Sequence, residues 1–416
     1  MAYTKAGTAM TGISPHYDPF QFYEDPYPTF RRLRREAPLY YNDDLDLWVL
    51  SRFEDVQSAV KNRSTFSSAQ GVALDDESAF YSPGAFLDYD PPDHDRLRAA
   101  MAAYFTPRAI IKLESAVRAK VSATLGPYLE RGEVDFARDV ARVVPSSVVC
   151  TLLGFPAEDH AQLLAWFELM TTKEAGSSTA PAQAWEANRA MRDYVHAAAL
   201  SRAQDPQDDM LTVLMHAQSE QIITGPELVG MSVLVFYAGI MTTAAFLSNS
   251  VKNLDLHREQ RDALIAEPAL IQGAVEELLR FDSPVQSVSR VTTREVSLHE
   301  RVIPAGARVL VLYGSANRDE SRWQAPDTLN INREHKQHLA FGVGLHHCLG
   351  SSLARLEGRV LIEELLRLIP DYQTAGDGKR LFAPHERGFE SLPIAFSPTS
   401  LDPCPASAEQ RPAAGR

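Results

Sequence analysis

The feature that most constrains this 416-residue chain is a cysteine set among glycines and histidines at positions 338 to 350. The segment reads His-Leu-Ala-Phe-Gly-Val-Gly-Leu-His-His-Cys-Leu-Gly, and a run with helical character follows it. Gly342 and Gly344 can take the positive φ angles that a tight loop needs, and Gly350 lets a flat group approach the backbone. Cys348 then lies near a helix N-terminus, where the dipole and free N–H groups favour an anionic sulfur. The sequence therefore predicts a loop that presents a thiolate.

Two other interpretations of this cysteine compete with that one. A lone cysteine is most often a buried, inert, small hydrophobic residue. A zinc site would need about four ligands, but His346, His347 and Cys348 are consecutive and point in different directions. Cys150 and Cys404 lie in unrelated surroundings. A single axial thiolate remains, and the proteins that use one are haem-thiolate proteins.

The pattern of this loop resembles the haem-binding loop of the cytochrome P450 family. The resemblance rests on Phe341-Gly342-x-Gly344-x-His346-x-Cys348-x-Gly350, followed by Leu353-Ala354-Arg355. It covers nearly the whole chain, from Asp18 to Phe396, with three further family motifs in order. It implies a mainly α fold with small β-sheets (α+β) around one haem b, iron protoporphyrin IX. It also implies that Cys348 ligates the iron and that its loop contacts the cofactor through Phe341, Gly342, His346 and Gly350.

Composition sets the outer limits. Length alone suggests two or three domains, whereas the resemblance implies one monooxygenase domain, residues 18–397, between a flexible tail (1–17) and a disordered tail (398–416). Three cysteines fit a reducing compartment, and the first fifteen residues lack a signal peptide, so we expect a cytoplasmic protein. A net charge of -13 argues against nucleic-acid binding. We expect a monomer.

The most apolar run, residues 228 to 251, contains no charged residue. Its length could span a bilayer, but glycine, serine, threonine and asparagine dilute it, and no second such run exists. A helix that is apolar all round is also typical of the core of a large protein. With Pro226 near its start, where proline is tolerated, the run predicts a buried central helix and no membrane association.

Part of this run resembles the family's oxygen-binding segment, usually Ala-Gly-x-acid-Thr. The matching residues are Ala238-Gly239-Ile240-Met241-Thr242-Thr243. The resemblance implies that Ala238 and Gly239 let the cofactor approach the helix and that the Thr242 hydroxyl serves oxygen binding. Met241 stands at the acid position and cannot relay a proton. Protons must therefore come through water, Thr242 or Thr243, through the substrate, or with a peroxide oxidant.

Two further motifs concern cofactor binding and support. His94 and Arg98 are four residues apart and share a helix face, which suits either a surface ion pair or a carboxylate pair. The resemblance assigns His94, Arg98, Arg290 and His346 to the haem propionates. Glu277 and Arg280 can pair on a helix surface, or, as the family's Glu-x-x-Arg motif implies, form a buried network under the thiolate loop.

The substrate pocket is the least defined site. Residues 67 to 87 form a long irregular loop that, in the resembled family, lies over the substrate. Segments from Phe281, Thr292 and Gly314 resemble bacterial members that O-demethylate small aromatics. No serine or arginine near Tyr237 offers to anchor a carboxylate, which favours a small neutral aromatic or apolar substrate. The candidate pocket residues are Val72, Leu74, Leu234, Tyr237, Ala238 and Val288.

The expected activity is hydroxylation or O-demethylation with O₂. The chain shows no dinucleotide fingerprint after a strand, so electrons should come from a ferredoxin and its NAD(P)H-dependent reductase. A basic patch of Arg96, Lys112, Arg355 and Arg359 could dock an acidic ferredoxin, although a solvated helix face explains the same residues. A peroxygenase, a natural-product tailoring oxidase and a non-enzymatic haem sensor or carrier remain as alternatives.

Overall fold

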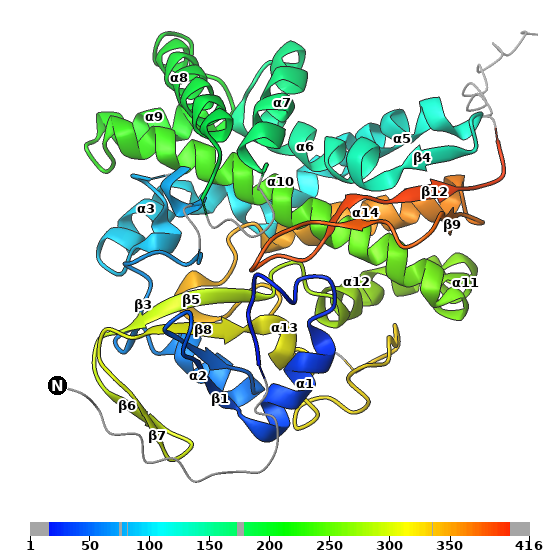
Figure 1. Ribbon diagram of the computed structural model, residues 1–416. Helices are drawn as coiled ribbons and strands as arrows, with labels where there is room; N and C mark the ends of the chain where they lie inside the picture. The colour runs from blue at the N-terminus through cyan, green and yellow to red at the C-terminus, as the bar shows by residue number, and fades with distance from the viewer. Residues whose placement is uncertain (1–15, 75–76, 81, 173–178, 335, 400–416) are drawn as a thin grey trace, which may run out of the picture.

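A computed structural model describes residues 16–74, 77–80, 82–172, 179–334 and 336–399. Helices make up the larger part of the molecule, and a five-stranded sheet lies beside them (Figure 1). The helices are α1 Tyr27–Glu36, α2 Phe53–Lys61, α3 Asp93–Met101, α4 Pro107–Ile110, α5 Glu114–Leu129, α6 Val143–Leu153, α7 His160–Met170, α8 Ala182–Gln204, α9 Met210–Ser219, α10 Gly225–Leu256, α11 Arg258–Ala266, α12 Ile271–Phe281, α13 Tyr313–Ala316 and α14 Ser351–Leu368.

The strands are short and gather in small sheets. They are β1 Leu39–Asn42, β2 Leu47–Leu50, β3 Phe66–Ser67, β4 Glu133–Asp135, β5 Ser287–Thr292, β6 Val296–Leu298, β7 Arg301–Ile303, β8 Arg308–Leu312, β9 Gln373–Thr374, β10 Lys379–Arg380, β11 Phe389–Ser391 and β12 Pro393–Ala395. The largest sheet has the order β1-β2-β8-β5-β3, in which only β2 and β8 pair in parallel. The expected α+β class is confirmed.

Helix α10 is the central element. It begins with a capping box, in which the Thr224 hydroxyl accepts from the Glu227 N–H and the Glu227 carboxylate accepts from the Thr224 N–H. The serines in its apolar run are satisfied within the helix, since the hydroxyls of Ser232, Ser248 and Ser250 donate to carbonyls four residues back. Its most apolar stretch is 83% buried. The run is therefore a core helix, as its composition predicted.

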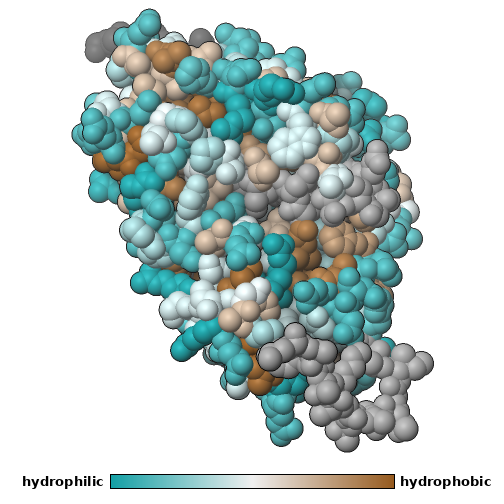
Figure 2. All heavy atoms as spheres, turned by 60° about the vertical axis from the view of Figure 1, so that its left-hand side comes forward, coloured by the Kyte–Doolittle hydropathy of each residue, from teal (hydrophilic) through white to brown (hydrophobic). Residues whose placement is uncertain are grey.

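The surroundings of α10 explain that burial. It contacts α6, α8, α9, α11, α12 and α14, and one hydrophobic cluster joins these helices. Two smaller clusters lie in the sheet part, one of them between α1 and strands β2 and β8. On the face in Figure 2, hydrophobic residues form small patches among hydrophilic ones. Most of the buried apolar side chains of the described residues thus belong to the core around α10.

The expected domain boundaries need small corrections. Tyr17 was assigned to the flexible tail, yet it is 3% exposed, packs on Phe30 and accepts a hydrogen bond from Asn42. Thr399 was assigned to the disordered tail, yet its N–H donates to the carbonyl of Leu129. The packed chain therefore extends slightly beyond the expected limits. Residues 1–15 and 400–416, which hold most of both tails, lie outside the described part.

Candidate active site

The cysteine loop has the geometry that its glycines predicted. Gly342 and Gly344 have φ angles of 63° and 75°, and the Cys348 N–H donates to the carbonyl of Phe341 at 2.9 Å. Cys348 is exposed at the surface of the loop. Protein atoms nevertheless surround its sulfur, and this desolvation raises the pKa of the thiol. The Gly350 N–H, which donates to the sulfur, and the positive charge of Arg98 lower that pKa. Cys150, in contrast, is buried. The loop thus presents one accessible sulfur with a donor aimed at it.

Helix α10 is less buried at one turn than along the rest of its core stretch. Between residues 228 and 254, all of which the structure describes, only Ala238, Gly239 and Thr242 are not fully buried. Ala238 and Thr242 lie on one face, and the Thr242 hydroxyl donates to the Ala238 carbonyl at 2.8 Å. A Cβ on Gly239 would lie 2.6 Å from Cγ2 of Val149, so this glycine serves the packing of α10 on α6. Met241 is 6% exposed.

Four basic side chains converge beside the loop. The rings of His94 and His346 lie 4.6 Å apart between centroids, and His346 Nε2 lies 3.2 Å from the Ser68 hydroxyl. Burial, together with Arg290, His94 and Arg98, lowers the pKa of His346 to about 3. Arg290, on β5, is 3% exposed, and Arg98 donates to the carbonyl of His347.

Within this basic cluster, His94 Nδ1 lies 2.9 Å from Asp95, whereas Arg98, Arg290 and His346 form no ion pair with a carboxylate among the described residues. His94 Nε2 and His346 Nδ1 are buried without a hydrogen-bond partner among the described residues. Among the described residues, Arg290 donates to one oxygen, the carbonyl of its neighbour Ser289. Buried polar groups ordinarily have hydrogen-bond partners, and burying basic groups without them costs folding free energy. The donors therefore suit a ligand that carries carboxylates.

One flat cofactor with two carboxylates and one metal ligand would satisfy these groups together. The described residues offer no group of three or more His, Cys, Asp or Glu side chains that could hold a metal ion. A metal bound here would thus depend on the single sulfur of Cys348. The fold and these residues define a haem-thiolate protein.

Comparison with known proteins leads to the same class. A model of the cytochrome P450 family matches residues 186–368. The putative cytochrome P450 123 of Mycobacterium tuberculosis is 35% identical over 386 residues, covering 91% of this chain and 96% of the relative. The steroid C26-monooxygenase of the same organism is 32% identical, covering 89% and 93%. The structure of PksS from Bacillus subtilis is similar with a TM-score of 0.84 at 30% identity, covering 92% of this chain and all of that one. The chain belongs to the cytochrome P450 family.

It is accordingly a haem-dependent monooxygenase, as predicted. When bound, the haem supplies an iron at which O₂ is activated, and thiolate donation favours cleavage of the O–O bond. Cys348 would hold the iron, while His94, Arg290 and His346 would hold the carboxylates. Thr242 offers its hydroxyl at the less buried turn of α10.

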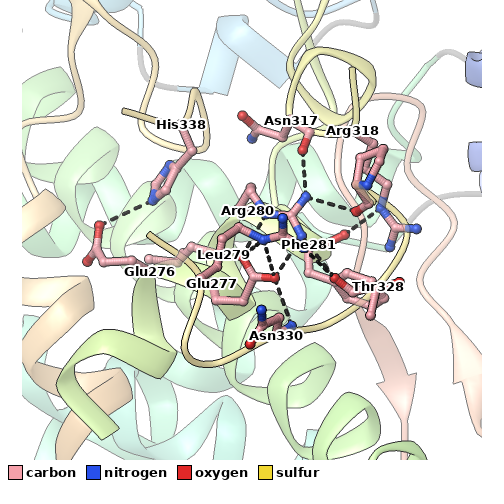
Figure 3. A network of polar contacts seen from close by, with 12 residues as sticks. Glu276, Glu277, Leu279, Arg280, Phe281, Asn317, Arg318, Thr328, Asn330 and His338 are labelled. Carbon is pink, nitrogen blue, oxygen red and sulfur yellow. Dashed lines mark hydrogen bonds and ion pairs between the residues drawn. The ribbon is translucent and has the colours of Figure 1, made fainter. Parts of the chain in front are cut away.

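The Glu-x-x-Arg pair lies in a buried network rather than on a helix surface (Figure 3). Arg280 donates to both carboxylate oxygens of Glu277 at 2.7 and 2.8 Å, and to the carbonyl of Asn317 at 2.8 Å. Arg333 donates to Glu277 as well, at 3.0 Å. Arg333 was not foreseen, because it lies in an irregular stretch without a recognisable pattern.

Glu276, next to Glu277 on α12, forms a second set of polar contacts. Glu276 accepts from Arg355 at 2.6 and 2.9 Å and lies 3.2 Å from His338, while the Arg355 guanidinium lies over the ring of Phe341. Hydrogen bonds from His338 and Arg355 overcome the effect of burial and lower the pKa of Glu276 to about 2. These contacts fix both ends of the loop; only the adjacency of the two glutamates hinted at them.

The expected pocket residues are not all brought together. Leu234 and Tyr237 lie in the main helical cluster, where the Tyr237 ring is 5.7 Å from that of Phe167. Leu74 packs with the cluster beneath α1, and Val288 packs with the sheet cluster. The Val72 carbonyl accepts from the N–H of Ser289. Only Leu234, Tyr237 and Ala238 therefore share one core region.

The expected basic patch is largely neutralised. Arg355 pairs with Glu276, Arg359 pairs with Glu114 and Glu363, and Arg96 pairs with Glu227 and Asp93. The arginines can be recognised in the sequence, but the carboxylates that pair with them lie on other helices, which the sequence pattern does not reveal. Among the described residues, only Lys112 of the four predicted basic residues forms no ion pair, so free positive charge gives this surface little support as a docking site.

Proposed function

We propose that this cytochrome P450 oxidises a small neutral aromatic or apolar molecule, by hydroxylation or O-demethylation. The observation that carries this proposal is the apolar, uncharged lining of the less buried turn of α10. Ala238 and Thr242 lie there, Leu234 and Tyr237 pack one turn earlier, and α10 has no charged side chain from residue 228 to 251. A pocket with this lining favours apolar ligands, because it offers a charged group no compensating partner.

A ligand screen tests the substrate class. Neutral aromatics, their methyl ethers and matched carboxylates should be added to the haem-loaded protein while the haem spin state is followed. We expect the neutral compounds to shift the spectrum and the carboxylates to leave it unchanged. Compounds that bind should then yield a hydroxylated or demethylated product when reductant is supplied. Shifts confined to carboxylates would refute this substrate class.

We propose further that electrons come from a ferredoxin that docks in a groove beside the thiolate loop. Residues from α4, α12 and the first turns of α14 line this groove, together with Ile111, which is 55% exposed. Because the neighbouring arginines are paired within the chain, the exposed apolar residue and the shape of the groove support docking more than free charge does. The protein would then work in the cytoplasm, as a monomer.

A surface variant tests this docking site. Ile111→Glu should raise the ferredoxin concentration needed for half-maximal reduction, and it should leave reduction by dithionite unchanged. Ile265→Glu is the matched control, because Ile265 is 39% exposed on α11, outside the groove. Equal effects of the two substitutions would exclude the groove as the docking site.

A peroxide-driven reaction is the second candidate activity. Met241 at the usual acid position favours it, because peroxide brings the protons that a methionine cannot relay. Product formation with hydrogen peroxide alone would support it, and its absence with a proven substrate would dismiss it. Intramolecular coupling or ring closure among the products would instead indicate a natural-product tailoring oxidase.

A further inference from the structure

The guanidinium of Arg355 contacts the thiolate loop both before and after Cys348. Its carbon lies 4.4 Å from the centre of the Phe341 ring, and its Nη1 donates to the carbonyl of Ser351 at 3.4 Å. The carbonyl of Phe341 in turn accepts the Cys348 N–H at 2.9 Å. A positive charge is therefore held against the two segments that fix the position of the sulfur.

One carboxylate holds this cation in place. Glu276, on α12, accepts from Arg355 Nε at 2.6 Å and from Nη2 at 2.9 Å, a two-point contact that suits a guanidinium. Glu276 also lies 3.2 Å from His338 Nε2, a contact drawn in Figure 3. These hydrogen bonds overcome the effect of burial and lower the pKa of Glu276 to about 2, so the carboxylate is ionised at neutral pH. The pair thus places one positive and one negative charge next to the loop.

The charge of Arg355 reaches the sulfur of Cys348. Burial raises the pKa of this thiol, whereas the Gly350 N–H and the positive charges of Arg98 and Arg355 lower it. A cation that stabilises the thiolate anion also stabilises further negative charge placed beside it, and an anion has the opposite effect. Arg355 should therefore favour a reduced metal centre at Cys348, and Glu276 should oppose it.

We propose that the Glu276–Arg355 ion pair sets the reduction potential of the haem that Cys348 ligates. Reduction adds one electron, and thus one negative charge, to the haem and its sulfur ligand, and no bond forms or breaks. Arg355 raises the potential and Glu276 lowers it. Both are positioning residues, because they act through the charge that they hold beside the loop. This effect requires neither the proposed substrate nor the proposed ferredoxin.

Neutralising each partner alone tests the proposal, because an effect of charge and an effect of packing differ in sign. Arg355→Gln should lower the potential and Glu276→Gln should raise it, each changing the equilibrium constant for one-electron reduction about tenfold, which is about 59 mV. The double variant should return close to the wild-type value. If the pair only kept the loop in shape, both single variants would lose the same contact and shift the potential in the same direction. A spectroelectrochemical titration of the substrate-free holoprotein with small-molecule mediators provides the measurement.

Two further variants separate this charge from others nearby. Arg355→Lys keeps the positive charge, so its potential should stay close to wild type even where the lost two-point contact lowers stability. Arg359→Gln removes a cation one turn further along α14, where Arg359 pairs with Glu114 and Glu363. It should shift the potential less than Arg355→Gln does. Equal shifts in these two Gln variants, or shifts of one sign in Arg355→Gln and Glu276→Gln, overturn the proposal.

An exposed position decides the question if the variants of the pair lose their haem. Gln272 is exposed on α12, one turn before Glu276, and lines the same groove as Arg355. Gln272→Glu adds a negative charge and leaves the pair intact, so it should lower the potential at low ionic strength and much less at high ionic strength. No shift at low ionic strength would overturn the role of charge. An enzyme whose potential responds as expected but that oxidises no substrate would instead overturn only the proposed function.

Discussion

The side-chain oxygen of Asn317 accepts the Leu339 N–H at 2.7 Å, while the Asn317 backbone carbonyl accepts from Arg280 at 2.8 Å. Asn317 is 0% exposed. It therefore joins the Glu277–Arg280 pair to the start of the loop that ends at Cys348. The loop is positioned through this asparagine, because Phe341, two residues after Leu339, accepts the Cys348 N–H.

Replacing Asn317 should loosen that connection. Asn317→Ala leaves the Leu339 N–H buried and unsatisfied, which should cost about 1–3 kcal/mol of unfolding free energy. Denaturant unfolding and the amount of haem retained on purification measure the effect. Asn330→Ala is a suitable control, because Asn330 is exposed and, among the described residues, its side chain accepts only from the Asn332 N–H. A Asn317→Ala protein as stable as wild type would contradict this role.

Removing one partner of the buried ion pair should be more damaging. Glu277→Ala would remove the carboxylate that pairs with Arg280 and Arg333, and Arg280→Ala would leave the Glu277 carboxylate without this partner. Each change should lower the free energy of unfolding by about 3–5 kcal/mol. We expect haem-free, largely insoluble protein. Arg333→Ala should be milder, because the Glu277–Arg280 pair remains. The yield of haem-loaded protein compares the three, and a soluble, fully loaded Arg280→Ala variant would refute the expectation.

The two described cysteines should differ sharply in a spectroscopic test. Cys348→Ser should abolish the thiolate signature of the reduced, carbon monoxide-treated protein. Cys150→Ser should keep that signature, because Cys150 is buried in the helical core. Any loss in Cys150→Ser should appear only in thermal stability. An unchanged spectrum in Cys348→Ser would mean that another side chain ligates the iron.

An acid introduced at position 241 should improve coupling. Met241→Asp places a carboxyl group next to Thr242, where protons are needed for O–O cleavage. The ratio of product to reductant consumed should rise, and hydrogen peroxide release should fall. Met241 is buried, so some stability loss is expected as well. Met241→Asn is the size-matched control. Equal coupling in both variants, with the haem spectrum intact, would count against proton supply as the limitation.

Acid stability should depend on Asp282. This buried carboxylate accepts from Arg387 and from the Tyr27 hydroxyl. Arg387 and Arg380 overcome the effect of burial and lower the pKa of Asp282 to about 2, below the usual 3.8. Its contribution, about 2–3 kcal/mol, is therefore present above pH 4 and is lost as pH falls toward 2.

Asp282→Asn should consequently flatten the loss of stability between pH 4 and pH 2, although the variant should be less stable at neutral pH. Thermal unfolding across this pH range provides the measurement. Asp377→Asn serves as the control, because the Asp377 side chain is fully exposed. If wild type and Asp282→Asn lose stability in parallel over this range, the ion pair does not contribute as described.

Local patterns were sufficient for the parts of the structure that are local. The positive φ angles of Gly342 and Gly344, the long core helix and the Glu277–Arg280 contact each follow from residues near one another in the chain. The family resemblance added the assignment of His94 and His346 to the same cofactor carboxylates, and these residues, 252 positions apart, have their ring centroids 4.6 Å apart.

Contacts between distant segments were beyond such reasoning. The carboxylates that neutralise Arg355 and Arg359 come from α12 and α5. The packing of Gly239 against Val149 depends on how α6 crosses α10. Leu74 packs against the cluster that includes residues of α1. This contact could not be predicted, because the irregular loop that holds Leu74 has no periodicity from which to infer a buried face. In each case the partner is set by tertiary packing, which composition and spacing do not encode.

The burial of α10 limits where this enzyme can be redesigned. Between residues 228 and 254 of this 32-residue helix, only the turn that holds Ala238, Gly239 and Thr242 is not fully buried, and its neighbours pack against other helices. Random replacement along α10 should mostly yield unstable proteins. A library confined to positions 238 and 242 should instead concentrate the variants with altered selectivity.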